Sequence, residues 1–168
     1  MVRNGFWIAL FSVLMLHMGA KMFETVSPFD YDQRIANITW KAATRLTGYD
    51  VAQRTAPQVR RSPILGEMMN ARGAYWCDTA IVWLDTGMTD NTQTWLTIFH
   101  EQVHYLQCLT SMDGWGYDKD LDCLIEREAN DFTTLYAKEL HTPVSYIRTD
   151  EEWRDIYNCK PTKQFMHP

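Results

Sequence analysis

Two histidines lie four residues apart in the stretch His-Glu-Gln-Val-His, which covers residues 100–104. Residues at this spacing on an α-helix project from one face about one turn apart, so the imidazoles of His100 and His104 can reach a single cation. Imidazole suits Zn²⁺, and Glu101 can take a proton from a water on that metal. The spacing therefore predicts one zinc site with two histidine ligands and Glu101 as general base.

A catalytic zinc of this type needs a third protein ligand and an open fourth position. On the helix expected after Asp120, an apolar stripe advances in steps of four and three residues, and position 128 within it is a glutamate. The other members of this stripe are Leu121, Ile125, Phe132 and Leu135. A carboxylate in a core-facing stripe is costly to bury unless it is paired or binds a metal. Glu126 falls about 160° away, on the polar side, so Glu128 is the predicted third ligand.

Both interpretations have a structural alternative. The histidine pattern arises by chance in about one per cent or less of chains of this length, in which case it marks two ordinary helix histidines and a surface glutamate. Glu128 could instead form a buried salt bridge with a lysine or an arginine. The placement of the histidine motif on a helix directly after a strand favours the zinc site.

The pairing of His-Glu-x-x-His on one helix with Glu-Ala on a later helix resembles the gluzincin group of zinc metallopeptidases, to which thermolysin belongs. The short form here, His-Tyr-Leu-Gln at 104–107 and Glu-Arg-Glu-Ala at 126–129, is similar to small bacterial domains of minimal zincin type. The match covers about residues 73–143.

This resemblance implies a role for each matched residue. His100, His104 and Glu128 correspond to the zinc ligands, and Glu101 corresponds to the general base. The segment 80–85 would be the substrate-binding edge strand. The group's partner acid follows the glutamate ligand by four residues, whereas Asp131 follows Glu128 by three.

Periodicity and capping residues predict the elements that position this site. An amphipathic helix should end at Gly48, and the segment 51–70 should hold an irregular strand and a short helical turn. Two short strands are expected at 74–77 and 80–85. The motif helix should begin at an N-cap, Asp90. The second site helix should extend from near Asp120 to before Pro143, and a last short helix should follow Thr149.

The composition fits one folded domain. The chain has 168 residues, of which 46% are hydrophobic and 22% charged, with seven Trp and eight Tyr. A net charge of -5 and the lack of a basic cluster beyond Arg60 and Arg61 argue against a nucleic-acid partner. We expect a single zincin-like domain over residues 24–168.

The N-terminus has the order of a secretory signal. Arg3 precedes an apolar run at 6–16, and Gly19 and Ala20 follow. Residues 1–20 are therefore predicted to direct export, to the periplasm or the exterior. An uncleaved membrane anchor and a buried N-terminal helix are the alternatives, and the membrane is expected as a partner only through an uncleaved segment.

Export would place the four cysteines in an oxidising compartment, where an even number fits two disulfides. If the two site helices are antiparallel and share one zinc, the end of the first meets the start of the second. This predicts a Cys108–Cys123 disulfide and leaves Cys77 and Cys159 as the second pair. The alternative is four free thiols in the core.

Taken together, these patterns predict an α+β fold of minimal zincin type that acts as a zinc metallopeptidase on a peptide or protein substrate. A cell-wall peptide crosslink is an alternative substrate. The alternative from another class is an exported structural or binding module that holds zinc without turnover. A zinc open to solvent beside Glu101 would indicate an enzyme, whereas a fourth protein ligand would indicate a structural site.

Overall fold

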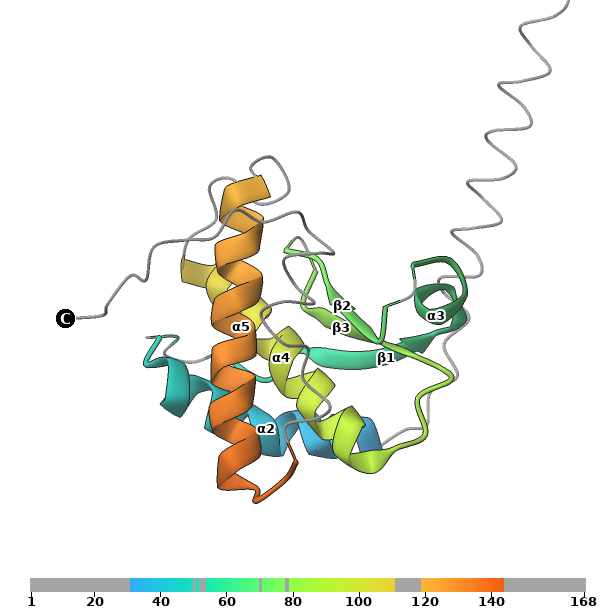
Figure 1. Ribbon diagram of the computed structural model, residues 1–168, viewed down its shortest axis with the longest axis horizontal. Helices are drawn as coiled ribbons and strands as arrows, with labels where there is room; N and C mark the ends of the chain where they lie inside the picture. The colour runs from blue at the N-terminus through green and yellow to red at the C-terminus, as the bar shows by residue number, and fades with distance from the viewer. Residues whose placement is uncertain are drawn as a thin grey trace, which may run out of the picture.

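The computed structural model describes residues 31–49, 51, 54–69, 71–77, 79–110 and 119–143. Within them the chain forms an α+β domain of four helices and a three-stranded mixed sheet, which confirms the predicted α+β class (Figure 1). The elements are α2 (Tyr31–Thr47), β1 (Gln58–Ser62), α3 (Pro63–Met69), β2 (Gly73–Tyr75), β3 (Ile81–Asp85), α4 (Asn91–Thr110) and α5 (Lys119–Glu139).

Some predictions lie outside these residues, namely the export segment 1–20 and the short helix after Thr149. Among the described helices, none has both the length and the apolar character that a membrane span requires.

The sheet has the strand order β1-β3-β2. β1 pairs in parallel with β3, and β2 pairs with β3 in the antiparallel sense. The central residues of β3, Val82, Trp83 and Leu84, are buried, as expected for a strand with a neighbour on each side. The expectation that segment 80–85 is an edge strand was therefore wrong. The polar sequence of β1, Gln-Val-Arg-Arg-Ser, gives little indication that this strand pairs with the other edge of β3.

Helix α2 ends where the sequence predicted. Its buried face carries Ile35, Ala36, Thr39, Trp40 and Ala43. Gly48 follows the helix with a positive φ of 68°, and its N–H donates to the Thr44 carbonyl at 3.2 Å. A glycine adopts this left-handed conformation without the steric cost of a Cβ, so the chain can leave the helix here and lead into Tyr49.

Helix α4 is the central element of the domain. It contacts β2 and β3 on one side and α2 and α5 on others, so it lies between the sheet and α5 (Figure 1). Every residue from Glu101 to Cys108 is buried. The predicted N-cap is confirmed, because Asp90 Oδ1 accepts the N–H of Gln93 at 2.8 Å.

Two faces of α4 have different partners. The face toward β2 carries Glu101, Tyr105 and Cys108, and the Tyr105 ring lies 5.4 Å from that of Tyr75. The face toward α5 carries His100, His104 and Gln107. Seven residues make almost two full turns of a helix, so residues seven apart lie on the same face. Cys108 therefore shares the face of Glu101, and Gln107 shares the face of His100.

This helical phase explains the disulfide. Cys108 bonds to Cys77, which follows β2, and their Cα atoms are 5.5 Å apart. The predicted Cys108–Cys123 and Cys77–Cys159 pairs were therefore wrong: Cys108 shares the face of Glu101, which points to the sheet and not to α5. Cys123 is also disulfide-bonded, while Cys159 lies outside the described residues.

Helix α5 packs through small and polar side chains. Its buried residues are Ala129, Asn130, Thr133, Tyr136 and Ala137. By contrast, Leu135, assigned above to the core stripe, exposes 45% of its surface. The buried face of α5 therefore combines small residues with Tyr136, whose ring stacks on that of Phe99 in α4 at 4.3 Å.

Candidate metal centre

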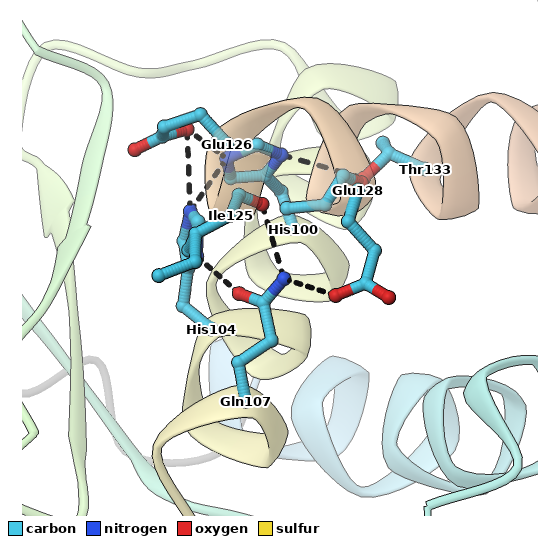
Figure 2. Close-up of polar contacts among 8 residues, drawn as sticks. His100, His104, Gln107, Ile125, Glu126, Glu128 and Thr133 are labelled. Carbon is cyan, nitrogen blue, oxygen red and sulfur yellow. Dashed lines mark hydrogen bonds and ion pairs between the residues drawn. The ribbon is translucent and has the colours of Figure 1, made fainter. Parts of the chain in front are cut away.

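Three side chains from α4 and α5 converge on one point. His100 Nε2 and His104 Nε2 are 3.0 Å apart, and Glu126 Oε2 lies 3.3 Å from each (Figure 2). Among the described residues, these three form the group that could hold a metal ion. The two histidines predicted as ligands are thus brought together as the spacing of the motif requires.

The acidic member of this group is Glu126 and not Glu128, so the predicted helix phase was wrong. Glu126 precedes Asn130 by four residues and Thr133 by seven, which places it on the buried face of α5. Glu128 instead accepts a hydrogen bond from Gln107 Nε2 at 2.7 Å (Figure 2). The small residues Ala129, Thr133 and Ala137 were the signal in the sequence that would have identified Glu126.

Each histidine has a neighbour at its other ring nitrogen. His104 Nδ1 is 2.8 Å from Gln107 Oε1, and His100 Nδ1 is 3.5 Å from Thr133 Oγ1. Thr133 donates its own proton to the Ala129 carbonyl at 2.7 Å, so its oxygen is left as an acceptor. Both rings are therefore placed to donate from Nδ1 and to present the Nε2 lone pair to the centre, as metal-ligating histidines do.

The donor atoms fit a small divalent cation. Three ligands at about 2.0–2.1 Å from a tetrahedral zinc are separated from one another by about 3.3 Å, close to the separations found here. Apart from the two imidazoles at 3.3 Å, Glu126 Oε2 is buried without a hydrogen-bond partner among the described residues. A buried carboxylate oxygen facing two imidazole lone pairs calls for a cation between them, either a proton or a metal.

Electrostatics in the metal-free centre agree with this geometry. Burial opposes the charged form of His104, but the Glu126 carboxylate outweighs burial and raises the pKa of His104 to about 9. Burial would likewise raise the pKa of Glu126, yet His104 and His100 hold it well below its usual value. The centre therefore retains a proton at neutral pH, with the charge of His104 balanced by that of Glu126, and a metal ion would replace that proton.

Glu101 lies beside the centre on the face toward β2. It is 6% exposed, and burial raises its pKa, an effect that the neighbouring His100 and His104 offset only in part. It packs against the backbone of Gly73, where a Cβ would lie 2.7 Å from Glu101 Oε1. Glu101 is not part of the group that could hold a metal ion.

The gluzincin pattern that the sequence resembles has an acid four positions after its glutamate. Counted from Glu126, this position is Asn130, which is 9% exposed. An amide thus stands where that group has an acid, and Asp131 is exposed. The amide nitrogen Nδ2 of Asn130 has no hydrogen-bond acceptor among the described residues.

No protein-family model matches the sequence, and no curated protein or solved structure is significantly similar to it.

Proposed function

We propose that the protein is a zinc-dependent metallopeptidase of minimal zincin type, with His100, His104 and Glu126 as zinc ligands and Glu101 as general base. The observation that carries this proposal is the convergence of three ligand atoms within 3.3 Å of one another beside a buried carboxylate. Two imidazoles and one carboxylate are the ligand set of thermolysin-like catalytic zinc, which leaves a fourth position for water or substrate.

The residues around the centre suit hydrolysis. Zinc held by these ligands would lower the pKa of a water and polarise the carbonyl under attack. Glu101 would take the proton from that water. Because burial raises its pKa, the protonated carboxyl persists to higher pH than in solution and can pass the proton to the leaving amine.

The sheet supports a peptide as substrate. Among the described strands, β2 pairs on one side only, with β3, and it packs against α4 next to Glu101. An extended peptide can add to such an edge through main-chain hydrogen bonds. The three residues of β2, Gly73–Tyr75, would align only a short stretch of substrate.

The test combines metal analysis with digestion of a broad peptide library. We expect one zinc per chain, lost with chelator together with activity. Glu101→Gln should retain zinc and lose turnover by several powers of ten, since it removes the water-activating group.

Two outcomes would contradict the proposal. Undiminished turnover of Glu101→Gln would exclude the mechanism. A wild-type protein that binds zinc stoichiometrically but cleaves no peptide or cell-wall crosslink would favour the module that holds zinc without turnover.

A further inference from the structure

A line of hydrogen bonds leads away from the candidate metal centre through α4 and α5 to Tyr49. His104 Nδ1 contacts Gln107 Oε1 at 2.8 Å, and Gln107 Nε2 donates to Glu128 Oε2 at 2.7 Å (Figure 2). The Tyr49 hydroxyl, just beyond α2, donates to the same oxygen at 2.9 Å. None of these three residues beyond His104 belongs to the ligand group.

The partners of Gln107 fix which way its amide points. Its Nε2 donates to the carboxylate of Glu128 and to the Ile125 carbonyl at 3.0 Å. A rotated amide would place its oxygen against these two acceptors, so Oε1 must face His104. An amide oxygen can only accept, and therefore His104 Nδ1 carries the proton and Nε2 is left as the ligand atom.

Glu128 and Tyr49 hold this arrangement from the other end. Burial, together with the hydrogen bond to Glu128, raises the pKa of Tyr49 well above its usual value, so its hydroxyl remains a donor. The left-handed turn at Gly48 allows Tyr49 to leave the axis of α2 and reach α5. Glu128 thus receives a donor from each of two other parts of the chain.

We propose that Gln107 is a positioning residue for the metal ligand His104, and that Glu128 and Tyr49 hold it in the one orientation that selects the Nδ1–H form of the imidazole. This inference rests on the proposed zinc site. In this proposal Glu128 holds Gln107 in place, whereas the sequence pattern predicted Glu128 as a zinc ligand. Partners of this kind change metal affinity by about 10–100-fold when removed.

The experiment compares Gln107→Leu and Tyr49→Phe with a matched control, Gln102→Leu. Gln102 is a second fully buried glutamine of α4, and its amide donates to the Ala36 carbonyl of α2 at 2.8 Å, away from the centre. Zinc affinity is measured by competition with a chromophoric chelator. The imidazole form of His104 is read from long-range ¹H–¹⁵N spectra of the metal-free protein at a pH above the pKa of His104.

We expect Gln107→Leu to weaken zinc binding by about 10–100-fold and to give a mixture of the two neutral imidazole forms. Tyr49→Phe should have the same effects at a few-fold level, and it keeps the test valid if Gln107→Leu does not fold. Gln102→Leu should lower thermal stability without changing zinc affinity or the spectrum of His104.

Zinc affinity and a His104 spectrum unchanged in both Gln107→Leu and Tyr49→Phe would overturn the proposal, as would an equal loss in Gln102→Leu. Because the spectra use metal-free protein, they test the positioning role independently. If wild-type protein bound no zinc, the proposed function would fail, while a change of imidazole form in Gln107→Leu would still show that Gln107 orients the ring.

Discussion

At the scale of single residues, the candidate metal centre brings three acceptor atoms close together. His100 Nε2, His104 Nε2 and Glu126 Oε2 repel one another unless a cation lies among them. In the metal-free protein a proton on His104 fills this role, because the Glu126 carboxylate outweighs burial and raises the pKa of His104 to about 9. Metal binding and proton binding are therefore alternatives at one place, and the acidity of the solution should affect both.

This competition gives a pH dependence of stability in metal-free protein. The pKa of His104 rises from 6.5 to about 9 on folding. The pairing with Glu126 therefore stabilises the fold fully below pH 6.5, and this contribution is lost as pH rises through about 9. Between these values we expect the free energy of unfolding to fall by at most about 3 kcal/mol.

Urea unfolding in the presence of chelator, at a series of pH values, measures this change. Glu126→Gln is the control, because the neutral amide lacks the charge through which Glu126 raises the pKa of His104. Its stability should vary much less over the same range, and its zinc affinity should fall severely. Parallel pH curves for wild type and Glu126→Gln would exclude the pairing.

The residues of the centre also show what the sequence could predict. His100, His104 and Glu101 followed from a spacing that fixes their relative directions on one helix. The choice between Glu126 and Glu128 depended on which face of α5 meets α4, and the bulky apolar residues gave the wrong answer. Gln107 was not predicted as a partner, because its role depends on Glu128 and Tyr49, which are distant in sequence.

At the scale of elements, α4 supplies different chemistry to its two neighbours. The face toward α5 carries the two histidines proposed as ligands, and the face toward β2 carries Glu101, the proposed base. Because consecutive residues on a helix are about 100° apart, ligand and base can be adjacent in sequence and still face different elements. The distance of Glu101 from the centre then depends on how closely β2 approaches α4.

Gly73 of β2 should therefore affect catalysis without binding metal. A Cβ at this position would lie 2.6 Å from Thr97 Cγ2 and 2.7 Å from Glu101 Oε1, so Gly73→Ala must displace one or both. We expect zinc content to be unchanged and turnover to fall by about 10–100-fold, as misplacement of a catalytic group by about 1 Å can cause. Peptidase assays with metal analysis measure both.

A second substitution separates displacement of Glu101 from a general loss of packing. Thr97→Ser removes the Cγ2 methyl, so the double variant with Gly73→Ala should recover thermal stability while its activity stays low. Recovery of full activity in the double variant would show that Glu101 is not displaced.

The sequence predicted the bounds of helices better than it predicted which elements pack or pair with one another. The N-cap at Asp90 and the glycine at position 48 are local signals, and they gave the start of α4 and the end of α2 correctly. The pairing of β1 with β3 is not local, and β1 is too polar to indicate it. The same limit applied to Cys108, whose partner depends on the direction of one face of α4.

At the scale of the whole molecule, the Cys77–Cys108 disulfide joins the end of the edge strand to the end of the central helix. The cysteines are 31 residues apart in sequence. Closing a loop of this length lowers the entropy of the unfolded chain and so stabilises the folded state by about 3–4 kcal/mol. All of β3 and the part of α4 that carries the site residues lie within this loop. Reduction should therefore destabilise the sheet and the helix together.

The same bond closes residues 77–108 into a covalent ring. The two fragments of a chain cleaved once within this ring therefore stay covalently joined. The connection from β3 to α4 is exposed at Thr89 and Asp90, and a specific protease site inserted between them would open the backbone within the ring. The fragments should remain together as one folded, zinc-binding species and separate in denaturing electrophoresis only after reduction. Separation without a reductant would contradict the ring. One backbone break in this connection would then leave β2 covalently attached to the helix that carries Glu101.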